Sequence, residues 1–394
     1  MRFSSLLDRI GGPSAAAWDI HYDALARFRR GEDVILLSQG DPDFDSPPAA
    51  VEAAIDALRT GDTHYVELTG RPELRTAIAR QHAQISGQAV GPENVIFLAG
   101  AQNALAAASL ALLEPGDEAI VPEPMYLTYA ATIGLPGARL VPVAQPLSRG
   151  LRLDPQALAA AVTPRTRAIF FATPNNPSGV AMTREELEAV ARIAIEHDLW
   201  VVADEVYATL VFDRPHVSIA GLAGMAERTV TVSSLSKSHA MTGWRAGWIV
   251  GPRPLVAELA KLSLCMLYGL PGFVQAGALA ALEQGEAEAD AMRAAYRRRR
   301  DLMAERLSAV QGLRPLLPEA GMFMLVDISA TGLSSEDFAW RLYRETGVSV
   351  LDASAFGPSL AGCVRLSFAA SEARLVEAAE RIRHFVGALM ESVS

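Results

Sequence analysis

The sequence predicts an α/β protein, in which a large domain with a mostly parallel central sheet flanked by helices precedes a smaller α+β domain. Between residues 95 and 250, short apolar runs alternate with longer helical segments. This is the order of parallel strands joined by helical crossovers. After about residue 285 the alternation stops, and a long charged helix leads into short strands and further helices.

The large domain is predicted from seven apolar runs. These runs are nearly continuous in apolar residues, which suits strands that are covered on both faces. The predicted strands cover residues 95–99, 119–121, 139–143, 168–172, 199–203, 229–232 and 247–250. Helices are expected at 101–113 and 183–197, and Thr183 with Glu186 can form a capping box at the start of the second.

The C-terminal part has a different pattern. It predicts a helix at about 287–310, a strand at 322–327, a helix near 335–346, strands near 348–351 and 364–368, and a last helix from Glu372. We therefore expect three parts. They are an N-terminal arm (1–45) that contributes to the small domain and the active site, a large cofactor-binding domain (46–285) and a small C-terminal domain (286–394).

Composition and charge exclude several classes of protein. The 394 residues include 45 acidic and 35 basic side chains, a net charge of −10. Such a surplus repels phosphate backbones, so no nucleic-acid binding is expected. The basic run 297–300, with Arg293, is expected to form a solvated, ion-paired helix face. Two cysteines cannot make a disulfide framework, which favours a cytoplasmic protein.

Membrane insertion and metal binding are not expected either. The uncharged runs 95–113 and 262–282 are interrupted by glycine, proline and amide residues, whereas a spanning helix needs about 20 mostly apolar residues. Asp8 and Arg9 interrupt the N-terminal apolar stretch before it reaches signal-peptide length. The histidines and cysteines form no pair at metal-ligand spacing.

A lysine among small hydroxyl residues is the first candidate for chemistry. Lys237 follows a predicted strand. Ser234 and Ser236 precede it, and Arg245 follows it by eight positions. A lone lysine in such a loop is usually solvated. A nucleophilic lysine must be neutral, and nearby cations and partial burial favour that state. Arg245 and the two serine hydroxyls could bind a phosphate.

The segment 234–247, SLSKSHAMTGWRAG, resembles the pyridoxal-phosphate (PLP) attachment pattern of class I aminotransferases. The resemblance covers nearly the whole chain, from about Ala15 to the last helix. It implies a fold type I PLP-dependent transferase in which Lys237 is the catalytic, cofactor-binding lysine. It also implies a homodimer whose active sites lie between the two subunits.

Further residues fit the cofactor. Gly100, Ala101 and Gln102 stand at a strand-to-helix junction, where free backbone N–H groups can bind phosphate; a plain tight turn is the alternative. The resemblance implies that Tyr126 stacks on the cofactor ring, although an ordinary tyrosine could stand there. It also implies that Asn176, in the motif TPNNPSG at 173–179, hydrogen-bonds the cofactor's phenolate oxygen; the alternative is a rigid turn.

Asp204 ends a buried strand, and Tyr207 follows three residues later. Open α/β sheets place ligand groups at the carboxyl ends of their strands, whereas the alternative for Asp204 is a helix N-cap. An aspartate beside the pyridine nitrogen would stabilise the protonated ring. The resemblance implies this role for Asp204, and it implies that Tyr207 joins Asn176 at the phenolate.

The resemblance also supplies candidate substrate residues. Arg365 lies within an apolar strand, and burying its charge is costly unless a partner is present. The resemblance implies that Arg365, Gly40 and Asn176 bind the substrate, with the α-carboxylate on Arg365. An arginine at a strand edge and a turn glycine are the alternatives. Tyr65 matches the tyrosine that reaches the phosphate of the neighbouring subunit.

Substrate identity depends on shorter matches. The stretches 15–22 (AAAWDIHY), 236–245 (SKSHAMTGWR) and 264–269 (LCMLYG) resemble arginine–pyruvate transaminases. This resemblance implies transfer from L-arginine to pyruvate, giving 2-ketoarginine and L-alanine. A guanidinium requires a carboxylate partner. Asp19 is the first candidate and Glu67 the second, and both could instead be solvated surface acids.

Three alternatives and one departure stay open. The chain could be an aminotransferase for aspartate, aromatic or glutamine donors, or a PLP-dependent carbon–sulfur β-lyase. The sensor half of a transcription regulator is disfavoured because the enzyme pattern begins by residue 15. The apolar cluster 265–268 is expected in the core or at a dimer interface. Where the family often has Pro-Gly shortly before Phe356 and Gly357, this chain has Asp352 and Ala353, which leaves the geometry of the substrate entrance open.

Overall fold

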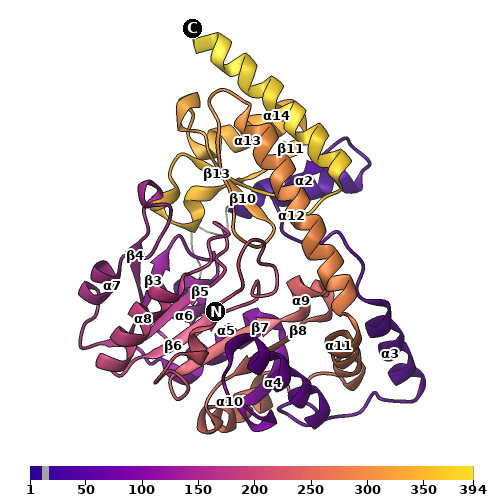
Figure 1. Cartoon of the computed structure of the whole chain (residues 1–394), viewed down its shortest axis with the longest axis vertical. Helices are drawn as coiled ribbons and strands as arrows, with labels where there is room; N and C mark the ends of the chain where they lie inside the picture. The colour runs from indigo at the N-terminus through magenta and orange to yellow at the C-terminus, as the bar shows by residue number, and fades with distance from the viewer. Residues whose placement is uncertain (11–16, 394) are drawn as a thin grey trace.

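A seven-stranded sheet forms the centre of the large domain, in a computed structural model that describes residues 1–10 and 17–393 (Figure 1). The strand order is β2-β8-β7-β6-β5-β3-β4, and all neighbouring strands are parallel except that β8 runs antiparallel to both β2 and β7. The strands are β2 (Val95–Ala99), β3 (Glu118–Glu123), β4 (Arg139–Ala144), β5 (Thr166–Ala172), β6 (Trp200–Asp204), β7 (Thr229–Ser234) and β8 (Ala246–Val250). The prediction of a mostly parallel sheet is confirmed.

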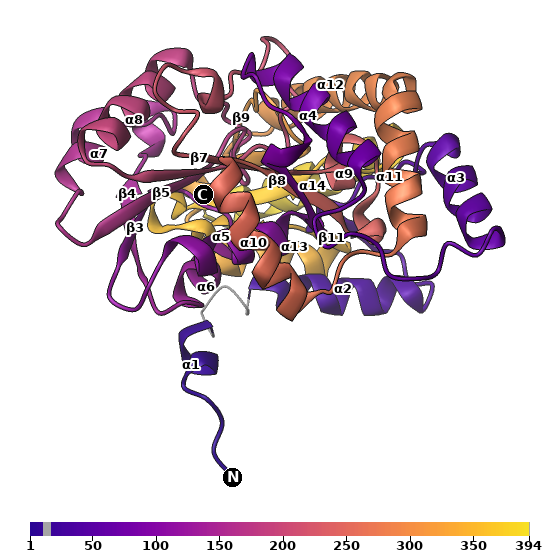
Figure 2. The same ribbon diagram turned by 90° about the horizontal axis from the view of Figure 1, so that it is seen from below.

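Helices cover both faces of this sheet (Figure 2). Successive strand residues point to opposite faces, so Ile96 and Leu98 pack on one side whereas Val95 and Phe97 pack on the other. One face is covered by α5 (Gly100–Leu112), α6 (Tyr129–Gly134) and α10 (Arg253–Met266). The opposite face is covered by α3 (Pro48–Arg59), α4 (Pro72–Ser86), α7 (Pro155–Ala160), α8 (Arg184–Glu196) and α11 (Gly272–Gln284). This burial of both faces explains the continuous apolar runs.

The small domain is built on antiparallel strands. Its sheet has the order β12-β13-β10-β9, with β9 (Arg314–Leu316), β10 (Phe323–Asp327), β12 (Leu351–Asp352) and β13 (Cys363–Ser367). The strand predicted at 348–351 is wrong as a single element. It divides into β11 (Val348–Ser349), which pairs in parallel with β1 (Ile35–Leu36), and β12, which pairs with β13. Residues 348–352 thus join two different sheets.

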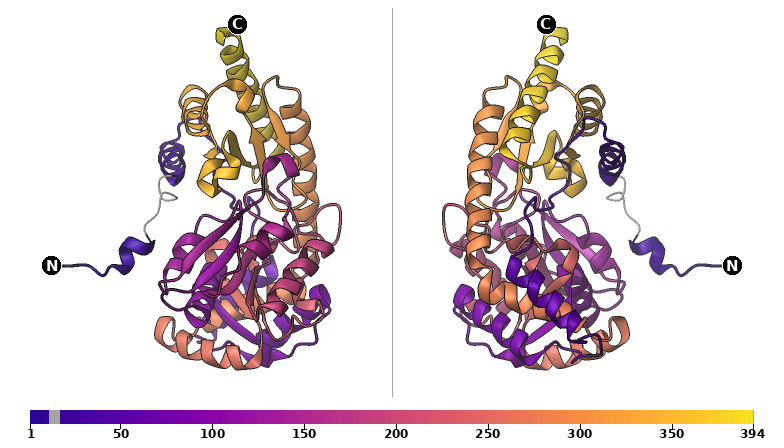
Figure 3. Two further views of the ribbon diagram at one scale, coloured as in Figure 1. Left: turned by 90° about the vertical axis from the view of Figure 1, so that its left-hand side faces the viewer. Right: turned by 90° about the vertical axis from the view of Figure 1, so that its right-hand side faces the viewer.

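Three helices complete the small domain and connect it to the large one. These are α12 (Glu286–Ser308), α13 (Ser335–Thr346) and α14 (Glu372–Val393), and α12 runs between the two domains (Figure 1). Near the N-terminus lie α1 (Leu6–Ile10) and α2 (Asp19–Arg29). The N-terminal end extends away from the body of the molecule (Figure 3), whereas α1 lies against α6, with Arg9 Nε donating to the Gly134 carbonyl at 3.3 Å. The pairing of β1 with β11 supports the predicted part played by the N-terminal arm, and the domain boundaries stay a prediction.

The arginine run on α12 is only partly a solvated face. Arg297 and Arg298 form surface ion pairs, as expected. Arg299 and Arg300 are buried, however, and pair with Asp43 at 2.7 Å and with Asp213 at 2.5 Å. The prediction was wrong for these two because the partners lie on distant segments, which helix periodicity does not reveal. Among the described residues, no helix is both long and apolar enough to cross a bilayer.

Candidate active site

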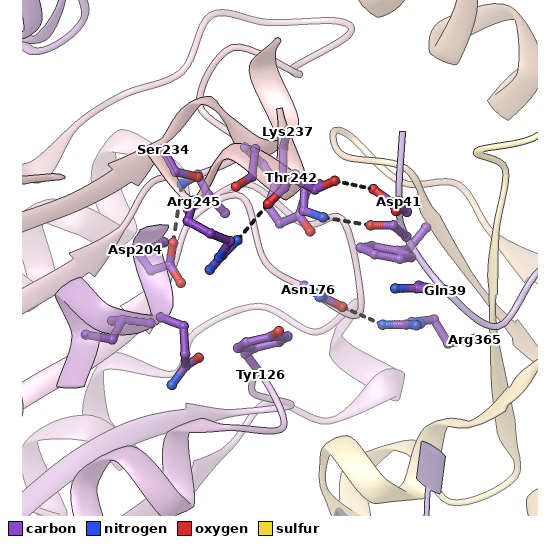
Figure 4. A pocket seen from close by; sticks show the side chains of 18 of the residues that line it. Gln39, Asp41, Tyr126, Asn176, Asp204, Ser234, Lys237, Thr242, Arg245 and Arg365 are labelled. Atoms are coloured by element: carbon purple, nitrogen blue, oxygen red, sulfur yellow. Dashed lines mark hydrogen bonds between the residues drawn. The ribbon is translucent and has the colours of Figure 1, made fainter. Parts of the chain in front are cut away.

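A cavity of about 240 Å³ lies at the carboxyl ends of β5, β6 and β7, where the small domain faces the sheet (Figure 4). This is the edge at which open α/β sheets bind ligands. Most of the predicted site residues line it: Gly40, Ala101, Gln102, Tyr126, Asn176, Asp204, Tyr207, Ser234, Ser236, Lys237, Arg245 and Arg365. Residues that are far apart in the chain, such as Gly40 and Arg365, are therefore brought together.

Lys237 lies in α9 (Leu235–Ser238), one short turn that follows β7. Its Nζ donates a hydrogen bond to the carbonyl of Gly40 at 2.7 Å. The pKa of Lys237 is lowered to about 8, chiefly by desolvation and also by the charges of Arg365 and Arg245, whereas the Asp41 carboxylate raises it. A substantial fraction of this amine is thus neutral near physiological pH, as a base or nucleophile must be.

Asp204 is the last residue of β6 and is buried. Its two oxygens accept hydrogen bonds from different donors, the Tyr129 hydroxyl at 3.1 Å and the Val206 backbone N–H at 3.3 Å. Desolvation nevertheless raises the pKa of Asp204 to about 6. Within the described residues this carboxylate has no cationic partner, so a cation placed beside it would stabilise its charged form.

Arg245, which lines the cavity, lies against Gly100 at the start of α5. The Arg245 guanidinium donates to the carbonyls of Thr242 (2.9 Å) and Ala99 (3.4 Å). A Cβ at Gly100 would lie 2.5 Å from Arg245 Nη2, and Gly100 has a φ of +80°, so glycine is required there. Arg245 itself adopts a φ of +54°, an uncommon conformation for a non-glycine residue that often marks functional sites.

Arg365 projects from β13 and is 2% exposed. Its guanidinium donates to Asn176 Oδ1 at 3.0 Å and to the Ser38 carbonyl at 2.7 Å, and Nε has no hydrogen-bond partner among the described residues. The guanidinium also lies 4.2 Å from the Phe323 ring centroid. Desolvation lowers the pKa of Arg365 to about 10, so an anion bound to it would offset a real burial cost.

Two tyrosines complete the wall of the cavity. Burial raises the pKa of Tyr207 well above its usual value, and the nearby Asn176 side chain acts in the other direction. Burial and the Asp204 charge also raise the pKa of Tyr126. Both side chains are therefore neutral phenols near pH 7 that can donate a hydrogen bond. Gln102 is different, because its side-chain amide donates to Thr132 and accepts from Thr128, which holds the side chain against that segment.

Three predicted residues do not line the cavity, namely Asp19, Tyr65 and Gly100, of which Gly100 lies against the lining residue Arg245. Asp19 is exposed at the start of α2, and the structure does not bring it to the cavity. Tyr65 is 84% exposed and lies against Tyr268, with a ring-centroid distance of 4.7 Å. Glu67, the second candidate acid, is exposed on the same segment. Tyr268 belongs to the apolar cluster 265–268, which lies at the surface rather than in the core.

The structure adds residues that sequence reasoning missed. The cavity is also lined by Trp18, Gln39, Asp41, Thr242 and Phe323. Tyr129 does not line it but donates a hydrogen bond to Asp204. Asp41 could have been suspected from its position next to Gly40. Tyr129 follows Tyr126 by three residues, a spacing that places two side chains on one side of a turn. Trp18 and Phe323 carry no local signal.

The charges of the cavity provide a test of whether its residues fit PLP. Asp204, Arg245 and Arg365 form no ion pair with any described residue. A cofactor with a protonatable ring nitrogen, a phosphate and an aldehyde, together with an amino-acid carboxylate, would supply one partner for each of these groups and for Lys237. Charged groups that are left without partners inside a cavity are typical of ligand sites. The residues therefore fit the cofactor.

Comparisons with known proteins agree with this geometry. The family model for aminotransferase class I and II matches residues 32–382. The chain is 55% identical over 382 residues to the arginine–pyruvate transaminase of Pseudomonas aeruginosa, which covers 97% of each protein. It is 38% identical over 378 residues to the aspartate/prephenate aminotransferase of Thermus thermophilus, covering 95% of this chain and 96% of that protein.

Solved structures of aminotransferases also superpose closely on this chain. An aspartate aminotransferase from Thermus thermophilus with maleate superposes with a TM-score of 0.92 at 37% identity, over 98% of this chain and 100% of that one. An aspartate aminotransferase from Rhizobium meliloti gives a TM-score of 0.92 at 33% identity, over 98% of this chain and 99% of that one. The chain is a fold type I protein and belongs to the PLP-dependent family of class I and II aminotransferases.

Proposed function

We propose that this aminotransferase transfers the α-amino group of L-arginine to pyruvate. The two half-reactions would convert L-arginine to 2-ketoarginine and pyruvate to L-alanine, with the amino group passing from one to the other. The observation that carries the cofactor assignment is the set of unpaired charges around Lys237. Support for these substrates comes from the relative that is 55% identical over 97% of the chain.

The proposed cofactor contacts follow from the cavity. Arg245, the backbone N–H groups of Ala101 and Gln102, and the hydroxyls of Ser234 and Ser236 would hold the phosphate, because the start of α5 is an anion site and Gly100 leaves room for the guanidinium. Asp204 would pair with the ring nitrogen. The remaining proposed contacts are Asn176 and Tyr207 at the phenolate oxygen and Tyr126 on the ring face.

Bound PLP supplies an electron sink that stabilises negative charge at the substrate Cα. The work of the chain is binding and proton transfer. Arg365 and Gly40 would hold the α-carboxylate, which places the Cα–H beside Lys237. A neutral Lys237 amine would take up that proton and afterwards give it up again, and a pKa near 8 suits both directions of transfer.

A homodimer is part of the proposal. Tyr65 and Tyr268 form an exposed aromatic pair, and Leu264 and Met266 beside them are also exposed. Large apolar side chains that are grouped at a surface indicate a contact with another molecule. A second copy that covered this face would bring Tyr65 towards the phosphate of its neighbour. We also propose a cytoplasmic location, in keeping with the two free cysteines.

A donor screen tests the proposed function. The PLP-loaded protein is mixed with pyruvate and each amino acid in turn, and alanine formation is followed. L-Arginine should give the highest kcat/KM. Ammonia and pyruvate released from a donor without any acceptor would instead identify a lyase, and a clear preference for aspartate or an aromatic donor would contradict the arginine assignment.

A further inference from the structure

We propose that Trp18 and Asp41 form the subsite for the donor's side chain, and that this subsite selects a planar cation over a carboxylate. The inference rests on the proposed function, because it takes PLP and the donor's α-carboxylate to occupy the groups named above. In this proposal the donor's side chain is recognised by residues other than Asp19 and Glu67.

The charged residues that line the cavity single out Asp41. Its lining contains three cations, Lys237, Arg245 and Arg365, and two acids, Asp41 and Asp204. In the proposed function Arg245 binds the phosphate, Arg365 binds the α-carboxylate and Lys237 transfers the proton. The buried Asp204 pairs with the ring nitrogen. Asp41 is the one charged group of this lining that remains. No cation of the lining is left for a second carboxylate.

The geometry of Asp41 also supports this subsite. It directly follows Gly40, whose carbonyl is 2.7 Å from Lys237 Nζ, so it lies close to the reacting atoms. Its Oδ1 accepts a hydrogen bond from Thr242 Oγ1 at 2.7 Å, as Figure 4 shows. Oδ2 has no hydrogen-bond partner in the part of the chain that the structure describes, and the residue is exposed to the cavity. This oxygen can accept from a guanidinium.

The placement of Trp18 supports it as well. The indole lines the same cavity and stands edge-to-face with the buried His21 ring, with centroids 5.8 Å apart. His21 Nδ1 is 2.9 Å from Ser38 Oγ, and the Ser38 carbonyl accepts from Arg365. Trp18 is therefore fixed to the segment that also anchors the α-carboxylate site. A tryptophan face is the best aromatic partner for a cation, and an aromatic face with a carboxylate suits a flat guanidinium.

This subsite has a consequence for the acceptor too. A 2-oxo acid with a second carboxylate would place negative charge near Asp41 with no cation to offset it, whereas pyruvate has only a methyl group. We therefore expect the enzyme to discriminate against dicarboxylic donors and dicarboxylic acceptors alike, because Asp41 would repel the second carboxylate of either.

The test compares L-arginine with L-alanine, which has the same reacting atoms but almost no side chain. The second-order rate constant of the half-reaction is measured for each with the PLP-loaded enzyme. Asp41→Asn should lower the arginine-to-alanine ratio at least about tenfold, the loss of one charge-assisted contact. Trp18→Leu should lower it roughly three- to thirtyfold. Using the ratio removes any effect of Asp41 on Lys237 itself, because both donors share that amine.

A binding measurement gives a readout that does not depend on turnover. 5-Guanidinopentanoate and pentanoate both offer a carboxylate to Arg365, but neither carries an α-amino group. Calorimetry on the loaded enzyme should find that the guanidino compound binds more tightly, and that Asp41→Asn removes most of this difference. Equal affinities in the unmodified protein would overturn the proposal.

Asp19→Asn is the matched control, since Asp19 is an exposed acid on the same arm, outside the cavity. It should leave the ratio unchanged. If Asp41→Asn slows arginine and alanine equally, or abolishes both, Asp41 serves the shared chemistry and the proposal is wrong. If Glu67→Gln instead lowers the ratio, the side chain is read by the segment around Tyr65. A protein that transfers no amino group from either donor would refute the proposed function itself, which is a different outcome.

Discussion

The two ends of the cavity are built differently. At the proposed cofactor end, Asp204 and Ser234 close buried parallel strands, and Asn176 and Lys237 follow such strands within a few residues. At the end proposed for the donor's side chain, Trp18, Gln39 and Asp41 come from the N-terminal arm and its connection to the large domain. In this proposal the sheet fixes the groups of the common chemistry, whereas the groups that would choose the donor lie on segments that can change without disturbing the core.

This contrast can be tested directly. Substitutions at the cofactor end should slow all donors by one factor, whereas those at the side-chain end should alter the ratio between donors.

Lys237→Ala should reduce transamination at least about a thousandfold for arginine and alanine alike, because no other group lies in place to move the Cα proton. Lys261 is the only other lysine of the chain, and it is exposed and paired with Glu258 at 2.7 Å. Lys261→Ala is therefore a matched control that should leave activity intact. Borohydride reduction followed by mass spectrometry should find PLP fixed at Lys237 alone; retained activity in Lys237→Ala would refute the assignment.

Asp204→Asn should lower kcat about a hundredfold or more, again by the same factor for every donor, because an amide cannot stabilise a protonated ring nitrogen. Tyr129→Phe removes one of the two hydrogen bonds to Asp204 and should cost only a few-fold. Steady-state kinetics with two donors measures both effects. A donor-dependent loss in Asp204→Asn would break the contrast between the two ends.

Gly100→Ala should weaken PLP binding about tenfold, because the new Cβ would lie 2.5 Å from Arg245 Nη2. The control is Gly87→Ala, since Gly87 has a similar φ of +74° but an added methyl group there would meet nothing within 4 Å. Both variants carry backbone strain, so only the contact with Arg245 distinguishes them. Titration of the cofactor-free proteins with PLP gives the affinities, and equal losses would place the phosphate elsewhere.

The pH dependence of PLP uptake should show the smallest effect. With a Lys237 pKa of about 8, the neutral amine predominates above that pH, so the rate of uptake by the cofactor-free protein should rise through pH 8 and then level. Asp41 raises the pKa of Lys237, so Asp41→Asn should move the midpoint to lower pH, by up to about one pH unit. A midpoint near that of free lysine would contradict the effect of burial.

The sequence was informative wherever the determinant was local. The capping box of α8 forms as expected, with Thr183 N–H donating to Glu186 at 2.7 Å and Glu186 N–H to Thr183 at 3.2 Å. The strands were found because burial on both faces leaves a continuous apolar run. The residues around Lys237 were found because one short motif fixes their spacing.

The sequence was silent where the determinant was a distant contact. The antiparallel direction of β8 has no local signature, since β8 is as apolar as the parallel strands of the same sheet. Burial of Arg299 depends on Asp43, which lies 256 residues away. Trp18 and Asp41 reach the cavity only because β1 joins the small domain through β11. Such pairings arise from packing, so periodicity and spacing cannot report them.

The arrangement of Arg365 connects recognition to the whole shape of the molecule. One guanidinium on the small domain is bonded both to the arm, through Ser38, and to the large domain, through Asn176. Nε has no partner among the described residues, so an incoming carboxylate can bind there without displacing these bonds, and its affinity depends on how the three parts hold the guanidinium. Mutations remote from the cavity that shift one part against another will therefore change KM although they touch no substrate atom.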